Sequence, residues 1–73
     1  MPASKTISDR ERECLEWLAR GERPDAIAYR LGIKRVTVDM HLRNARVKLN
    51  AATREHAVAL AVHSKLIDLK RPS

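Results

Sequence analysis

The sequence predicts an all-α fold, a single small domain of four helices. Apolar residues recur every three or four positions in four successive segments, and no segment alternates apolar and polar residues as a strand would. Capping and turn residues separate these segments where helix ends are expected. At 73 residues the chain is one domain with a thin core, because so short a chain buries only roughly 60% of its unfolded surface.

The first helix is predicted over residues 9–20. Ser8 and Glu11 have the spacing of a capping box, in which each side chain accepts a hydrogen bond from the other residue's backbone amide. Gly21 is the residue type expected just past a helix end. The apolar positions between these signals are Cys14, Leu15 and Leu18.

The second helix begins at Pro24, since proline suits the first helical position, and it ends at Gly32, which permits a tight turn. Its apolar stripe consists of Ile27, Ala28 and Leu31, and Ile33 is expected to point inward after it. A third helix, residues 35–49, has one face formed by Val38, Leu42, Ala45 and Leu49. Thr53 can cap a fourth helix, residues 54–65, with one side formed by Ala57, Leu60, Ala61 and Ser64.

The expected domain covers residues 7–68, between a disordered N-terminal segment, 1–6, and a frayed tail, 69–73. No apolar run resembles a signal peptide or a membrane span. A lone cysteine, Cys14, precludes an internal disulfide and fits a reducing cytoplasm, which is the expected location.

The charge balance predicts a nucleic-acid partner. The formal net charge is +6 and the isoelectric point about 10.3, an excess that suits a polyanion. The chain has one Trp, one Tyr and no Phe, whereas proteins that bind single strands stack bases on exposed aromatic rings. Duplex DNA is therefore the favoured partner.

Two helices joined by a glycine-containing turn, the second long and basic, indicate a helix-turn-helix unit whose recognition helix is the third helix. The face opposite its core stripe carries Val36, Met40, Arg43 and Val47, with Asp39 and Asn44 at the flanks. Arginine can bond guanine with two donors and methyl groups can meet thymine. The predicted base-reading residues are Val36, Asp39, Met40 and Arg43. Asp39 either accepts a bond from cytosine or pairs with Arg43 one turn away.

Basic side chains flank the predicted reading face and are expected to meet phosphates. Arg23 and Lys34 occupy N-cap positions, where a positive charge opposes the helix dipole. An arriving phosphate would relieve that opposition; alternatively, these side chains swing into solvent. The full predicted phosphate set is Arg23, Lys34, Arg35, Thr37, Asn44, Arg46 and Lys48.

The run from Ile7 through Ile67 resembles the C-terminal DNA-binding domain of LuxR-type regulators. The resemblance rests on DREREC with Leu15, on IA and RLGI in the second helix, on VTV and HLRNA in the third, and on Lys48-Leu49. ECL with Trp17, and HAVALA near the end, are most similar to the quorum-sensing branch.

The resemblance implies a quorum-sensing transcription regulator that binds an inverted repeat as a dimer. Val58 and Val62 on the fourth helix are the expected dimer contact. RNA polymerase is a further expected partner. The branch carries an N-terminal acyl-homoserine-lactone domain that this sequence lacks, so either the chain is a fragment or the protein acts without that domain. Three positions depart from the family pattern. Asp39 stands where a basic or polar residue is common, so the base preferences of the family do not carry over to this chain. Arg23 and Lys34 replace the usual capping serine or threonine.

Other classes fit less well. No catalytic triad or carboxylate pair indicates an enzyme, and neither a cofactor nor a metal is predicted from His41, His56 and His63, which lack ligand partners at suitable spacing. A promoter-reading sigma-factor domain is one alternative, although the fourth helix has no place in it. A helical protein-interaction module is another, and its binding should change little with salt, whereas DNA binding should weaken steeply.

Overall fold

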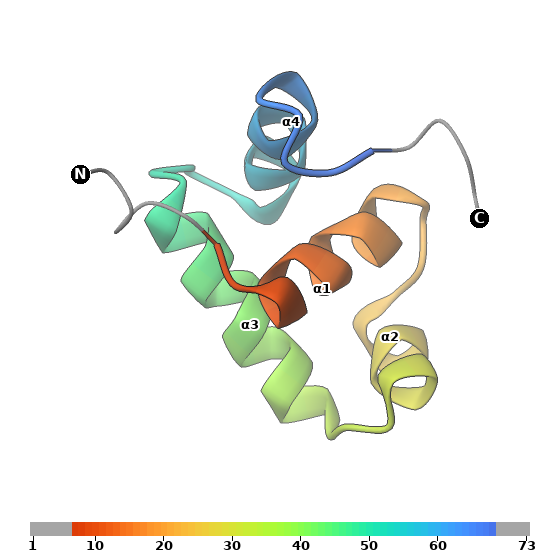
Figure 1. Ribbon diagram of the computed structural model, residues 1–73. Coiled ribbons are helices and arrows are strands. Elements are labelled where there is room, and N and C mark those ends of the chain that lie inside the picture. Colours follow the sequence, from red (N-terminus) through yellow and green to blue (C-terminus); the bar gives the residue numbers. More distant parts are fainter. Residues whose placement is uncertain (1–6, 69–73) are drawn as a thin grey trace.

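The computed structural model describes residues 7–68, in which four helices follow one another and no strand occurs (Figure 1). They are α1 (Asp9–Ala19), α2 (Pro24–Leu31), α3 (Arg35–Lys48) and α4 (Arg54–His63). The all-α prediction is thus confirmed, while the predicted disordered segment 1–6 and frayed tail 69–73 lie outside the described residues. Within those described residues, no helix has both the length and the apolar character needed to cross a membrane.

The four helices surround one small core. α1 lies in the middle, with α4 above it, α2 below it and α3 along its side (Figure 1). α1 packs against each of the other three helices, and α3 also packs against α2 and α4. The turn between α2 and α3 comprises only residues 32–34, so these two helices form the helix-turn-helix unit.

Two helices begin with the caps that the sequence predicts. The Ser8 hydroxyl accepts a hydrogen bond from the Glu11 amide at 3.1 Å, and the Glu11 carboxylate accepts one from the Ser8 amide at 2.9 Å. The Thr53 hydroxyl accepts a hydrogen bond from the His56 amide at 3.0 Å. These bonds satisfy amides that have no partner inside the helix, which fixes where α1 and α4 begin.

All four helices end in the same kind of turn, in which one residue adopts a left-handed backbone. These residues are Gly21, Gly32, Asn50 and Lys65. At the end of α4, Lys65 has a φ of 62°, and the next amide bonds back to the Ala61 carbonyl at 2.8 Å. A left-handed residue cannot continue a right-handed helix, so α4 ends at His63, two residues before the predicted end.

The inner faces are buried largely as predicted. Val38, Leu42 and Ala45 of α3 are buried together with Cys14 and Leu15 of α1, Ile27 and Ala28 of α2, and Ala57 and Ala61 of α4. Leu18, Leu31, Ile33, Leu49 and Leu60 are partly buried and pack against this core. Ser64, which the sequence places on the same side of the fourth helix as Ala57 and Ala61, is exposed and does not join the core. It lies past the last residue of α4, where the helical periodicity no longer sets its direction.

One ion pair within the fold joins residues that are distant in sequence. The Lys48 ammonium lies 3.0 Å from one carboxylate oxygen of Glu11 and 3.3 Å from the other. The Glu11 side chain is only 6% exposed, and the same carboxylate caps α1. This pair therefore ties the start of α1 to the end of α3.

Candidate nucleic-acid interface

The outer face of α3 carries apolar side chains that the fold leaves in solvent. Val36 is 67% exposed and Val47 63%, and both Met40 and Arg43 are also exposed. They lie opposite the buried stripe formed by Val38, Leu42 and Ala45. Exposed apolar side chains gathered around a cation favour a face that a partner covers.

Four side chains of this face line an open hollow of about 230 Å³. They are Val36, Asp39, Met40 and Arg43, the same four residues that the sequence predicts to read bases. The hollow combines methyl groups, the donors of a guanidinium and the acceptors of a carboxylate. That set complements the mixed donors, acceptors and methyl groups at base edges in the DNA major groove.

Asp39 pairs with a different arginine from the one considered above. Its carboxylate lies 3.4 Å from Nε of Arg35, one turn toward the N-terminus. The alternative in which Asp39 forms a surface pair with Arg43 was therefore wrong, since no such pair is present within residues 7–68. The Arg43 donors are consequently not taken up by Asp39.

Arg35 is held by two carboxylates from two helices. Besides Asp39, the Asp25 carboxylate of α2 accepts a hydrogen bond from Nη1 at 2.8 Å. The hydrogen bond that Arg35 donates to Asp25 and the charges of both carboxylates raise the pKa of the Arg35 guanidinium, which stays protonated throughout. These three side chains, Asp25, Arg35 and Asp39, are called the α2–α3 charge cluster below.

The N-termini of α2 and α3 remain without side-chain caps. Arg23 and Lys34 occupy the N-cap positions, neither makes a capping hydrogen bond, and both are exposed. The first turn of α3 has no acidic residue. Thr37 and Asn44 are partly buried along the same helix. The start of α3 thus combines a helix dipole with basic side chains, an arrangement that attracts anions.

Two other predicted phosphate-binding residues are engaged inside the domain. Lys48 forms the pair with Glu11, and Arg46 donates a hydrogen bond from Nη1 to the Ala51 carbonyl at 3.2 Å. Their phosphate roles stay predictions. The capping box marked Glu11 as a structural residue, but no pattern in the sequence linked it to Lys48.

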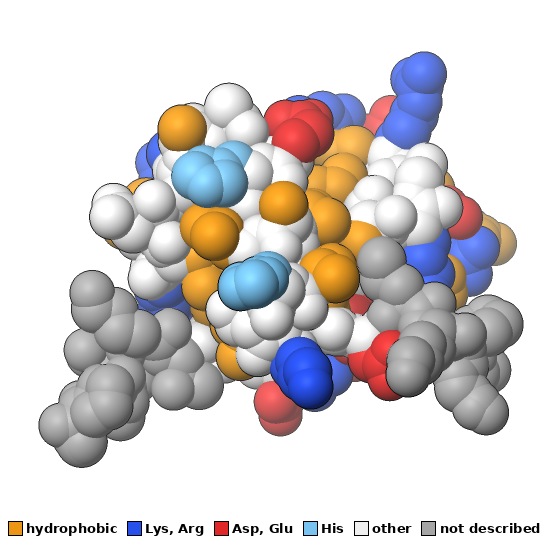
Figure 2. Space-filling view, turned by 90° about the horizontal axis from the view of Figure 1, so that it is seen from above, with side chains coloured by type: hydrophobic (Ala, Val, Ile, Leu, Met, Phe, Trp, Pro, Cys, Tyr) orange, Lys and Arg blue, Asp and Glu red, His pale blue; other side chains and the backbone are white. Residues whose placement is uncertain are grey.

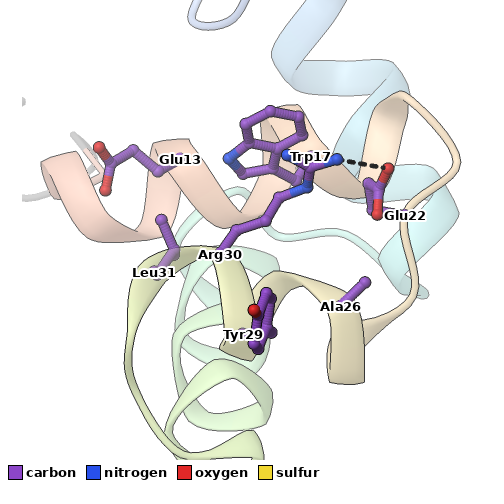
Figure 3. A pocket seen from close by; sticks show the side chains of 7 residues that line it. All are labelled: Glu13, Trp17, Glu22, Ala26, Tyr29, Arg30 and Leu31. Atoms are coloured by element: carbon purple, nitrogen blue, oxygen red, sulfur yellow. Dashed lines mark hydrogen bonds and ion pairs between the residues drawn. The ribbon is translucent and has the colours of Figure 1, made fainter.

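A groove lies on another side of the domain, between α1 and α2 (Figure 3). Arg30 reaches from α2 over the indole of Trp17, with 4.2 Å between the guanidinium carbon and the ring centre. Glu22 holds the same guanidinium at 3.2 Å. Trp17 itself is partly buried and packs against the core.

The Cys14 side chain is completely buried. Burial raises the pKa of its thiol to about 11, so the thiol is protonated at neutral pH. Cys14 is thus a packed apolar residue with no nucleophilic character. Within residues 7–68, no group of three or more His, Cys, Asp or Glu side chains is arranged to hold a metal ion.

Cys14 should resist a thiol-specific reagent at about pH 8 in the folded domain, because only the exposed thiolate reacts. In urea it should react rapidly, and the native-state rate should follow the unfolded fraction. The reagent releases a coloured thiolate when it reacts, so absorbance measures the rate of Cys14 modification both in the folded domain and in urea. Rapid modification without urea would show that α1 opens locally, contrary to this expectation.

The fold and the exposed recognition helix define a helix-turn-helix domain, and comparison with known proteins gives its family. Residues 5–61 match the luxR family of bacterial regulatory proteins. The chain is 43% identical over 63 residues to VjbR of Brucella abortus, an HTH-type quorum sensing-dependent transcriptional regulator. It is 35% identical over 66 residues to the transcriptional activator protein LuxR of Aliivibrio fischeri and 36% identical over 63 residues to AhyR of Aeromonas hydrophila.

The chain belongs to the luxR family of bacterial regulatory proteins, and the relatives it matches are named as transcription regulators. The match with VjbR covers 86% of this chain and 24% of VjbR, and the match with LuxR covers 90% and 26%. The chain therefore spans about a quarter of the length of these relatives, and its matching part is the helix-turn-helix domain.

Proposed function

We propose that this chain binds duplex DNA sequence-specifically, with α3 in the major groove, as part of a bacterial transcription regulator acting in the cytoplasm. The observation that carries the proposal is the exposed hollow lined by Val36, Asp39, Met40 and Arg43 on α3. An α-helix fits the major groove, which is about 12 Å wide. Family membership and the net charge of +6 support the same partner.

The side chains of the hollow are suited to different base edges. Arg43 can donate two hydrogen bonds to O6 and N7 of guanine. Asp39 supplies only acceptors, which suit the amino group of cytosine and repel phosphates. Val36 and Met40 are apolar and can contact the thymine methyl group.

Lys34 and Arg23 are proposed to contact phosphates at the edges of the groove. Both lie at helix N-termini without a capping hydrogen bond, and both are exposed. A phosphate there would meet a cation together with unpaired backbone amides. Such contacts position the protein on the duplex without reading its sequence.

Replacing Lys34 with alanine should weaken binding to all duplex sequences alike. One phosphate contact is lost, so the slope of log affinity against log salt should fall by roughly one unit. Fluorescence anisotropy of a labelled duplex at several salt concentrations measures this slope. Lys65→Ala removes the same charge from the far end of α4 and should leave the slope nearly unchanged. An altered base preference with an unchanged slope would contradict the phosphate role of Lys34.

Dimerisation through α4 is proposed for the DNA complex. Seen from the α4 side, Figure 2 shows hydrophobic side chains gathered among histidines on this surface. Val62 is exposed there, and Val58 is partly buried beside it. A helix this short offers a small contact, so the free domain is expected to be monomeric and DNA to bring two copies together.

The experiment that tests the proposal selects bound sites from random duplexes and then varies the half-site spacing. An inverted repeat with half-site centres about 10 base pairs apart is expected. Shifting that spacing by about five base pairs, half a helical turn, should remove cooperative binding, because the second copy would face the opposite side of the duplex. Unchanged affinity after the shift in spacing would reject the dimer. If the domain shows no salt-dependent binding to any duplex, DNA is rejected as its partner.

A role in quorum sensing is proposed from the relatives, one of which is described as a quorum sensing-dependent regulator. Acyl-homoserine lactone binding would need a further domain outside this sequence. Contact with RNA polymerase stays a prediction from the family.

A further inference from the structure

The α2–α3 charge cluster lies across the helix-turn-helix turn, next to the hollow. Arg35 directs Nη1 to Asp25 of α2 and Nε to Asp39 of α3, so its guanidinium is held from two sides. Asp25 had no role in the sequence analysis. The distance from Arg35 Nη1 to the Asp25 carboxylate is 2.8 Å, whereas that from Arg35 Nε to the Asp39 carboxylate is 3.4 Å. Asp25 is therefore the stronger anchor of Arg35.

All three side chains remain accessible to an incoming phosphate. The Arg35 side chain is 52% exposed and that of Asp25 77%. Asp25 and Asp39 occupy donors on Nη1 and Nε and offset the charge of the guanidinium, so Arg35 attracts a phosphate less strongly, although the Nη2 donors stay unused by either carboxylate. The anchored Arg35 is therefore less available to DNA than the uncapped Lys34 beside it.

The cluster also bears on Asp39, which lines the hollow. A carboxylate close to DNA is repelled by phosphates unless a cation lies next to it. Arg35 supplies that cation, and Asp25 keeps the guanidinium from rotating away. The arrangement holds the Asp39 acceptors at the edge of the hollow beside a cation.

We propose that Asp25 is a positioning residue for base reading: it anchors Arg35, which holds Asp39 at the hollow and is withheld from the phosphates of unrelated DNA. The proposal rests on the DNA-binding function proposed above. It predicts that releasing Arg35 strengthens binding to random sequences and weakens base preference together. Simple loss of a negative charge would strengthen all binding without changing base preference.

The test compares Asp25→Asn with Asp9→Asn. Asp9 is a matched control, since it is an exposed aspartate in the first turn of α1 and pairs with Arg12 at 3.4 Å. Binding of Asp25→Asn to random duplex should be about two- to fivefold tighter than that of the control, the range set by the strength of an exposed ion pair. Its salt slope should be steeper by about one unit. Its base-preference profile should lose the position that Asp39→Ala loses.

An Arg35→Gln background completes the test. There Asp25→Asn should change neither the salt slope nor the base preference, because the proposed effect acts through Arg35. The proposal is overturned if Asp25→Asn behaves like Asp9→Asn, or if its effects persist without Arg35. If only the role of Asp25 is wrong, the wild-type domain still prefers certain sequences. If the proposed DNA-binding function is wrong, the wild-type domain shows no salt-dependent binding to duplex DNA.

Discussion

Replacing Glu11 with alanine is expected to lower the free energy of unfolding by about 3 kcal/mol. The change removes the acceptor for the Ser8 amide and the partner of Lys48, both close to 3 Å away. Loss of one partner of a buried ion pair costs about 3–5 kcal/mol, and the lower end applies because the Lys48 side chain is 35% exposed and can turn to water. Urea unfolding followed by circular dichroism measures the difference.

Two further variants isolate the cause. Glu13→Ala breaks an exposed pair with Arg10 on the same helix and should cost less than about 1 kcal/mol. Adding Lys48→Met to Glu11→Ala removes the ammonium left without its partner and should recover part of the lost stability. Equal losses for Glu11→Ala and Glu13→Ala would contradict the central role of the Glu11–Lys48 pair.

The contribution of Glu11 should also depend on pH in a defined direction. Burial alone raises the pKa of Glu11, but the Ser8 amide and the Lys48 ammonium outweigh it and leave the pKa below the ordinary value of 4.5. A carboxyl whose pKa is lower in the folded state contributes stability above its unfolded pKa and loses it as the pH falls through the folded pKa. Unfolding free energy should therefore decrease with acid below about pH 4.5, and less steeply in Glu11→Gln.

Replacing Arg43 with alanine is expected to weaken binding to the selected DNA site by about 5- to 150-fold, equivalent to about 1–3 kcal/mol. Arg43 is exposed in the middle of the hollow, and Asp39 does not occupy its donors. Random duplex should lose much less affinity, because only the base contact is sequence-specific. Arg54→Ala removes an equal charge from the start of α4 and is the matched control.

The base-preference profiles of Arg43→Ala and Asp39→Ala show whether these two residues read separate bases. Since Asp39 pairs with Arg35 and not Arg43, the two variants should relax preference at different positions. Relaxation at one shared position would mean that Asp39 orients Arg43 on DNA. If neither variant changes any preference, α3 is not the reading element and the proposed site is wrong.

The helices and the buried stripe of α3 could be predicted from the sequence because they depend on neighbouring residues. Helical periodicity assigned Val38 and Leu42 to the core and Val36 to the outer face, which the structure confirms. The caps at Ser8 and Thr53 were predictable for the same reason, since a capping side chain bonds an amide within its own first turn. Placing the four proposed base-reading residues in one hollow followed from their spacing on a single helix.

The partners of the long charged side chains could not be predicted in this way. Lys48 and Glu11 are 37 positions apart, and they meet only because α1 and α3 pack together. Arg35 pairs with a carboxylate on each of two helices, Asp39 on its own helix and Asp25 on α2. Asp25 comes within reach only because of the angle at which the turn joins α2 to α3. Periodicity identifies the face of a helix, whereas these contacts depend on how helices cross.

The two faces of α3 have a consequence for how such regulators diversify. Val36, Met40 and Arg43 lie outside the buried core, which on α3 consists of Val38, Leu42 and Ala45. Mutations that retarget the domain to another operator are then nearly neutral for folding, since exposed substitutions usually change stability by within about 0.5 kcal/mol. Gene duplication followed by drift on this outer stripe can create regulators for new promoters, and libraries randomised at these positions should yield mostly folded proteins.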